Sequence, residues 1–224
     1  MSHTQSLPQT PQREVFFIIF ITYTMKNIIT KNIVIQDMAR EDLDGLSVLV
    51  SNWQQNNGFM RFLKETPMAP TQNLSILQKE FDTPQSIFKS IKIDGIQDVV
   101  WFLLFHCFDA TNNEIELWFR IDPLLQHKGI CTQAVKESIA EVLSQNDIEH
   151  IVWWHSAWNR GSFGVFRKSG FQIVDFVTDQ TFLPNIGKTT DDFKWQISKG
   201  DTQIHTDKKN RIQAWLKKHD LNLF

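Results

Sequence analysis

The most regular alternation of apolar and polar residues lies in residues 114–121. Every second residue of this run is apolar: Ile115, Leu117, Phe119 and Ile121. A period of two is typical of a β-strand that turns one face toward a core. Glu114, Glu116 and Trp118 therefore belong to the opposite, more polar face of the same strand.

A helical period follows this strand. Apolar or small residues recur at i, i+3, i+4 and i+7, which predicts an amphipathic helix packed on a sheet. They are Cys131, Ala134, Val135, Ser138, Ile139, Val142 and Leu143. Between strand and helix lies a short loop with Gly129, which has no Cβ and lets a ligand approach the backbone. A loop of this kind is typical of a phosphate site, because the free N–H groups and dipole of the helix favour an anion.

Shorter patterns predict the remaining elements. Further strands are expected at residues 33–35, 86–93, 99–108, 148–156, 171–177 and 192–197. Further helices are expected at residues 40–50, 71–81 and 207–219, with Thr71 as the N-cap of the second. A short helix begins at Asn159 and ends at Gly170. Loops are expected at residues 52–70 and 182–190.

This mixture of strands and helices predicts one α/β domain, and 224 residues suffice for it. Hydrophobic residues make up 42% of the chain and charged residues 21%, as in soluble globular proteins. The net charge of -2 provides no global basic field that would attract nucleic acid. Cys107 and Cys131 lie in apolar contexts, so a cytoplasmic protein is expected rather than a disulfide scaffold.

The N-terminal segment stands apart from this domain. Residues 1–13 are polar and contain proline, which predicts disorder. Residues 15–21 are apolar, but with their flanks they reach about half of the roughly 20 residues of a membrane span. They are an appended strand, a membrane-associated segment, or translated sequence upstream of a start at Met25, which we favour. We divide the chain into a segment 1–25, a domain 26–198 and a basic helical extension 199–224.

Three features in order along the chain resemble the GNAT superfamily of N-acetyltransferases. The first is a strand that ends at Asp122-Pro123. The second is Gln126-x-x-Gly129-x-Cys131, which is similar to the Arg/Gln-x-x-Gly-x-Gly/Ala loop that binds the pyrophosphate of acetyl-CoA. The third is Asn159-x-x-Ser162 with Gly170-Phe171, as in the RimJ/RimL-like branch that acetylates ribosomal-protein N-termini. The resemblance covers residues 32–198.

The resemblance implies a mixed, mostly antiparallel central sheet flanked by helices and splayed near Phe119 and Trp153 to admit acetyl-CoA. It also implies transfer of the acetyl group to a primary amine by direct attack. The amine is a protein N-terminus or a small molecule such as an antibiotic or a polyamine. The residues implied to bind the co-substrate are Phe119, Ile121, Gln126, His127, Lys128, Gly129, Ile130, Cys131, Thr132, Asn159 and Ser162. The backbone of residues 119–121 would pair with the pantetheine arm like an added strand.

Direct attack needs a deprotonated amine, and two side chains are candidates for the catalytic base. Glu116, half-buried beside Trp118, is the first, and Glu114 on the same face is its substitute. His155 is the second, because imidazole titrates near neutrality. Each also has an ordinary interpretation, as an ion-paired glutamate or a structural histidine.

The chain departs from the family pattern at two positions. Cys131 stands where glycine or alanine is usual, and we interpret it as a packing residue rather than a nucleophile. Phe166 stands where many members have a tyrosine that protonates the departing thiolate, and the only tyrosine, Tyr23, lies far upstream. A thiol is a good leaving group, so loss of this acid need not abolish turnover.

Two other functions remain open. The absent tyrosine leaves room for a catalytically silent acyl-CoA-binding module with a regulatory or interaction role. The basic residues of 207–219 would suit nucleic acid, but we favour a solvated helix docked on the domain. Our expectation is an enzyme that acts as a monomer or homodimer, without a metal site and without a membrane or nucleic-acid partner.

Overall fold

The computed structural model describes residues 33–55, 67–93, 101–121, 125–144, 148–183, 187–200, 204 and 206–219. Every described residue belongs to the unit Ile33–Phe224. The predictions for segment 1–25, for Asp122-Pro123 and for most of the loop 52–70 lie outside the described residues. Among the described helices, none has the length and hydropathy needed to span a membrane.

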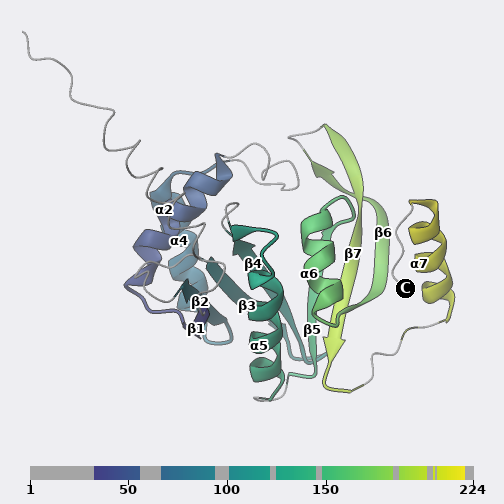
Figure 1. The fold of residues 1–224 in the computed structure, drawn as a ribbon, viewed down its shortest axis with the longest axis horizontal. Coiled ribbons are helices and arrows are strands. Elements are labelled where there is room, and N and C mark those ends of the chain that lie inside the picture. Colours follow the sequence, from purple (N-terminus) through teal and green to yellow (C-terminus); the bar gives the residue numbers. More distant parts are fainter. Residues whose placement is uncertain are drawn as a thin grey trace, which may run out of the picture. The chain divides into compact units, whose positions relative to one another are not determined.

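A seven-stranded sheet forms the centre of the fold, with the strand order β1-β2-β3-β4-β5-β7-β6 (Figure 1). The strands are β1 (Ile33–Asp37), β2 (Ile87–Ile93), β3 (Trp101–Asp109), β4 (Glu114–Ile121), β5 (His150–Ser156), β6 (Gln172–Leu183) and β7 (Lys188–Ser198). Only β4 and β5 run parallel, and all other neighbouring strands are antiparallel. The mixed, mostly antiparallel sheet is therefore confirmed.

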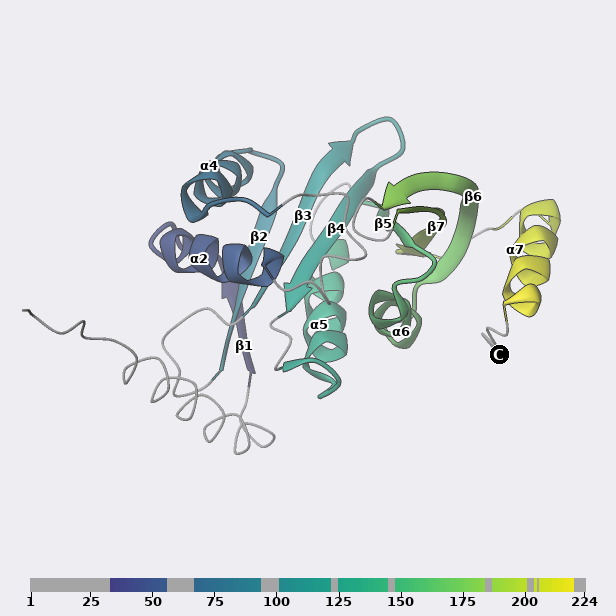
Figure 2. The same cartoon turned by 90° about the horizontal axis from the view of Figure 1, so that it is seen from above.

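Helices cover both faces of the sheet (Figure 2). They are α2 (Asp42–Gln54), α4 (Pro70–Phe81), α5 (Ile130–Ser144), α6 (Arg160–Lys168) and α7 (Thr206–Lys218). Figure 2 shows α2 and α4 on one face, which we call the α2/α4 face, and α5 and α6 on the other, the α5/α6 face. The two faces follow from the alternation in β4, because Ile115 and Leu117 are buried in the cluster under α5 and α6, whereas Trp118 packs against the cluster under α2 and α4.

The sheet splits between its two parallel strands. The pairing of β4 with β5 runs from Glu114↔His150 to Glu116↔Val152 and then stops. Beyond this point β4 continues to pair with β3 as far as Ile121, and β5 continues to pair with β7 as far as Ser156. The two strands therefore diverge toward their carboxyl ends, which confirms the splay predicted near Phe119 and Trp153.

Two local predictions are wrong. Thr71 does not cap α4: the N-cap is Ala69, followed by Pro70, and the Gln72 side chain accepts a hydrogen bond from the Ala69 N–H at 3.0 Å. Residues 182–190 are not a simple loop, because β6 extends to Leu183 and β7 begins at Lys188. Cross-strand pairs such as Thr181↔Thr190 stabilise this longer hairpin despite its polar sequence.

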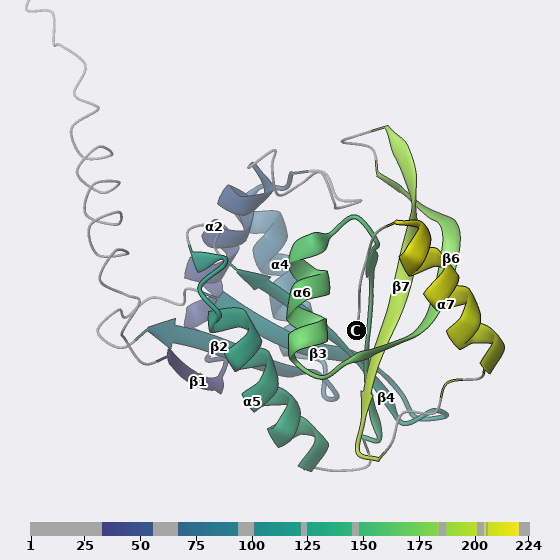
Figure 3. The same cartoon turned by 45° about the vertical axis from the view of Figure 1, so that its right-hand side comes forward.

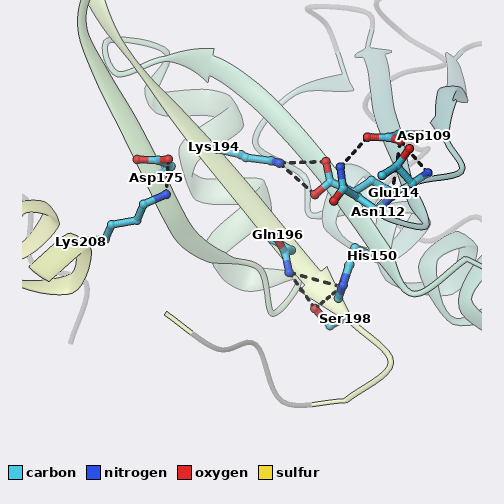
Figure 4. Close-up of polar contacts among 10 residues, drawn as sticks. Asp109, Asn112, Glu114, His150, Asp175, Lys194, Gln196, Ser198 and Lys208 are labelled. Carbon is cyan, nitrogen blue, oxygen red and sulfur yellow. Dashed lines mark hydrogen bonds and ion pairs between the residues drawn. The ribbon is translucent and has the colours of Figure 1, made fainter. Parts of the chain in front are cut away.

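Helix α7 docks on the β6–β7 hairpin through its apolar stripe (Figure 3). Ile212 and Leu216 are buried in the same cluster as α5 and α6, and the Trp215 ring packs edge-on against Phe193 at 4.7 Å. Lys208 forms an ion pair with Asp175 of β6 (Figure 4). The guanidinium of Arg211 lies over the Phe176 ring at 5.0 Å, and Lys209, Lys217 and Lys218 are exposed, so the expected docked helix is confirmed.

Candidate active site

The split in the sheet places two helix N-termini at the same edge. Strand β4 leads to α5 and strand β5 leads to α6, and the two strands are parallel. Their carboxyl ends therefore meet at one edge, where α5 and α6 begin side by side (Figures 1 and 3). Ligands of α/β proteins characteristically bind where parallel strands diverge at their carboxyl ends.

The loop before α5 has the backbone of an anion site. Leu125 anchors it in the core, while His127 and Gly129 have positive φ angles of 61° and 79°. Alternation of left-handed and ordinary residues turns successive N–H groups toward one point. A Cβ added to Gly129 would meet nothing within 4 Å, so the space beside this backbone is open. Gln126 is half-buried, and the side chains of His127 and Lys128 are exposed at the same loop.

The first turn of α5 supplies further backbone N–H groups. Ile130 and Thr132 are half-buried, and among the described residues the Gln133 N–H is the first of the helix with a backbone partner, the Gly129 carbonyl at 3.1 Å. Cys131 is buried, and burial raises the pKa of its thiol well above the usual value. A protonated, buried thiol is not a nucleophile, which agrees with the prediction that Cys131 is a packing residue.

Beyond Glu116, strand β4 has an edge that no described strand pairs with. Phe119 and Ile121 lie on this stretch, and both are half-buried. Phe119 packs against Trp153 and Phe166 at ring distances of 6.1 and 5.5 Å, so aromatic rings line the α5/α6 side of the split. Open backbone beside an apolar wall suits the extended, partly apolar pantetheine arm of coenzyme A.

At the start of α6, Asn159 acts as the helix N-cap. Its Oδ1 accepts a hydrogen bond from the Ser162 N–H at 3.2 Å, as its position predicts. Both residues are half-buried at the edge where the sheet splits. Gly170 has a φ of 92° just after α6, which confirms that it ends this helix.

Glu116 is the last residue of β4 paired with β5, and its side chain lies on the α2/α4 face beside Trp118. The Trp118 indole N–H donates a hydrogen bond to Glu116 Oε1 at 3.1 Å. This bond fixes the carboxylate at the base of the split. Glu114, the substitute candidate, is instead held by Lys194 of β7 at 2.8 and 2.9 Å (Figure 4).

His155 lies inside an aromatic stack on the other face. Its ring stacks on Phe166 and Trp195, each at 5.9 Å, and its Nδ1 lies 2.6 Å from the Ser156 carbonyl oxygen. Burial lowers the pKa of His155 to about 4, against the opposing hydrogen bond. The histidine is therefore neutral, and it lies on the opposite face of the sheet from Glu116.

The structure adds two residues near Glu116 that the sequence analysis did not identify. His106 pairs with Glu116 across β3 and β4, and Cys107 follows it at an irregularity in β3. Glu80 Oε2 of α4 lies 3.5 Å from His106 Nδ1. Partial desolvation of the exposed Cys107 thiol, together with the carboxylates of Glu116 and Glu80, raises its pKa. No glycine or proline marks the irregularity, so no residue type along the chain signals this cluster.

Comparison with known proteins agrees with this geometry. The family model described as acetyltransferase (GNAT) domain matches residues 32–172, more than half of the chain. The chain belongs to the GNAT acetyltransferase family. A GNAT acetyltransferase is an acyltransferase that uses acetyl-CoA, so acetyl-CoA is the co-substrate of this protein. The open Gly129 backbone and the unpaired edge of β4 fit that molecule.

Solved structures share the GNAT fold at low sequence identity. The ribosomal L7/L12 α-N-protein acetyltransferase RimL in complex with coenzyme A has a TM-score of 0.65 at 15% identity, covering 76% of this chain and 96% of that one. Spermidine N-acetyltransferase from Vibrio cholerae in complex with coenzyme A and spermine has a TM-score of 0.63 at 15% identity, covering 74% and 95%. The microcin C7 self-immunity acetyltransferase MccE in complex with acetyl-CoA and AMP has a TM-score of 0.64 at 16% identity. The match covers 76% of this chain and 94% of that one. The search of curated proteins found no match.

Proposed function

We propose that this GNAT enzyme transfers an acetyl group to a primary amine, with Glu116 as the base that accepts the amine proton. The observation that carries this proposal is the split between β4 and β5. It leaves an unpaired stretch of β4 that begins at the fixed carboxylate of Glu116 and leads toward the open loop at Gly129. A molecule held at the loop and threaded along β4 would bring its thioester toward Glu116.

The co-substrate would be held mainly by backbone groups. The N–H groups of residues 129–132, at the start of α5, would bind the pyrophosphate, helped by the exposed cationic side chain of Lys128 and by Gln126 and His127. The edge of Phe119 and Ile121 would pair with the pantetheine arm, and a backbone N–H there would stabilise the developing oxyanion. Asn159 and Ser162 would bound the same molecule from α6.

Glu116 would act on the α2/α4 face. Trp118 holds one carboxylate oxygen, so the second is oriented to accept a proton directly or through one water. Phe166 is fully buried, and its ring has no acidic proton to donate. The departing thiolate would therefore take its proton from water. We do not assign His155 a step, because it is neutral and enclosed by aromatic rings.

The acceptor is a cationic amine in its resting form, and acidic groups on the α2/α4 face suit it. Glu80 and Glu116 lie within one cluster there. V. cholerae spermidine N-acetyltransferase and RimL, which share the fold, are named for a polyamine and a protein N-terminus. We propose one of these two amine classes for this chain, in keeping with its resemblance to the RimJ/RimL-like branch.

A panel of amines tests both the activity and the acceptor. Release of coenzyme A from acetyl-CoA would be followed with polyamines, aminoglycosides and short peptides with free N-termini. Turnover with polyamines or with peptides assigns the class. Binding of acetyl-CoA without turnover on any amine would instead favour a silent acyl-CoA-binding module.

The Glu116→Gln variant tests the base. We expect turnover to fall most at low pH, where the fewest acceptor amines are neutral and proton removal limits the rate. The ratio of wild-type to variant kcat/KM should therefore rise as the pH is lowered. Glu114→Gln is the matched control, since Glu114 is paired with Lys194. A pH profile that is the same for wild type and Glu116→Gln would remove Glu116 from the mechanism.

We propose an acetyltransferase domain over residues 26–198, because β7 completes the sheet after the family match ends at 172. We propose residues 199–224 as a docked extension, in which α7 packs on β6.

A further inference from the structure

Strand β3 ends in an irregularity that brings two neighbouring side chains together. Cys107 has a φ of 53°, and the pairing of β3 with β4 shifts between His106 and Asp109. In a regular strand, His106 and Cys107 would point to opposite faces. Here Cys107 Sγ lies 3.4 Å from His106 Nδ1. The bulge therefore gathers a thiol and an imidazole on one side of the sheet.

A carboxylate completes the group. Glu116 is the cross-strand partner of His106, and the ligand atoms of His106, Cys107 and Glu116 all lie within 4.8 Å of one another. Ligands in a tetrahedral zinc site lie about 3.3–3.8 Å apart, as follows from bond lengths of about 2.0–2.3 Å. Side-chain movements of about 1 Å would therefore close these three atoms around a metal ion. Glu80 lies next to His106 and offers a second carboxylate.

The surroundings of His106 also point to a ligand. The residue is 6% exposed, and its Nε2 has no hydrogen-bond partner among the described residues. Its polar contacts in this part of the chain are with Cys107 and Glu80, both beside the same cluster. Buried polar atoms are normally hydrogen-bonded, so an unpartnered imidazole nitrogen calls for an explanation such as a bound ion. Cys107 is exposed, so an ion has a route from solvent.

We propose that His106, Cys107 and Glu116 bind a divalent transition metal ion of the zinc class, and that the bound ion inhibits the enzyme by occupying Glu116. Nitrogen, sulfur and carboxylate oxygen are the donors that zinc prefers, whereas magnesium and calcium prefer oxygen alone. As the Sγ–metal bond forms, the Cys107 thiol releases its proton to solvent. Glu80 or a water molecule takes the fourth position.

The inhibitory part rests on the proposed role of Glu116 as the base. A carboxylate bound to a metal ion cannot accept the proton of the amine, so acetyl transfer stops while the ion is bound. The enzyme would then be active when a chelator removes the metal ion and inactive when Zn²⁺ is bound. Metal binding itself needs no turnover, so the two proposals can fail separately.

Titration of the full-length, tag-free protein with Co²⁺ and Zn²⁺ tests the site. We expect one Co²⁺ per chain, with the near-ultraviolet charge-transfer band of a Co²⁺–thiolate bond, and displacement of that band by Zn²⁺. Cys107→Ser should abolish the band, while Cys131→Ala, which removes the other thiol, should retain it. Removing a residue that only hydrogen-bonds to a metal ligand typically lowers metal affinity by roughly 10- to 100-fold. Calorimetry should show a larger loss of Zn²⁺ affinity for Cys107→Ser and His106→Gln, because each removes a ligand itself.

Two results would overturn the site: no saturable Zn²⁺ binding to wild type, or binding that is unchanged in Cys107→Ser. Circular dichroism of each variant shows whether a loss of binding reflects unfolding. Should His106→Gln unfold, Cys107→Ser still decides the question, because its exposed side chain supports little packing. Stoichiometric binding without inhibition of turnover would keep the metal site but reject its link to Glu116.

Discussion

At the scale of single residues, His155 carries the clearest pH dependence. Burial lowers its pKa from 6.5 to about 4, so the unfolded chain takes up the proton first as the pH falls. Its contribution to stability is complete above pH 6.5 and is lost between pH 6.5 and pH 4. At about 1.4 kcal/mol for each pKa unit, about 2–3 kcal/mol of unfolding free energy should be lost by about pH 4.5.

Urea unfolding at about pH 7 and about pH 4.5 measures this loss. The His155→Phe variant keeps an aromatic ring in the stack with Phe166 and Trp195 but cannot be protonated. Its stability should therefore change less with pH than that of the wild type. An equal change in both proteins would show that His155 is not the group that titrates.

Around Glu116, the sequence predicts some neighbouring residues but not others. Its face and its neighbour Trp118 followed from simple alternation in β4. His106 and Cys107 did not, because alternation sends them to opposite faces and only the bulge brings them together. A bulge at cysteine has no signature like that of glycine, so the cluster emerges only from the paired strands.

At the scale of elements, the turn from β4 into α5 depends on Gly129. Gly129→Val should abolish acetyl-CoA binding, because a β-branched residue is strained at a φ of 79° and its Cβ would enter the open space beside the loop. Calorimetry with acetyl-CoA measures the affinity. Gly187→Val is the matched control, since Gly187 also has a positive φ, 62°, with open space around it.

The control should lose some stability but bind acetyl-CoA as the wild type does. Equal affinities for wild type and Gly129→Val would reject the loop as the pyrophosphate site. If both glycine variants lost binding equally, the effect would come from general backbone strain rather than from the loop.

Helix α7 is a second element whose role can be measured. Leu216→Ala should lower the unfolding free energy by roughly 2–5 kcal/mol, because it leaves a cavity between α7 and the sheet. Lys217→Ala, on the exposed side of the same helix, should change it by less than about 0.5 kcal/mol. Urea unfolding distinguishes the two. Equal stability of Leu216→Ala and wild type would mean that α7 does not support the domain.

At the scale of the whole molecule, the order of strands and helices was largely predictable, while the hairpin β6–β7 was not. The apolar periods of β4, β5 and α5 are strong because each element buries apolar residues in the core: the two strands bury at least one face, and the helix buries one stripe. The hairpin contains polar residues such as Thr181 and Thr190, which pair across the strands and are buried, with side-chain hydrogen bonds to Asp192 and Ser156. The contact with Ser156 depends on a residue distant in sequence, and polar residues buried in this way leave no local apolar period.

The split sheet is the feature of the whole molecule on which the proposed chemistry depends. A crystal structure with coenzyme A bound tests it most directly. The account predicts the pyrophosphate on the N–H groups of residues 129–132 and the pantetheine arm paired with β4 at Phe119 and Ile121, its thiol directed toward Glu116. A coenzyme bound elsewhere, or a gap between β4 and β5 closed by side chains in its presence, would contradict it.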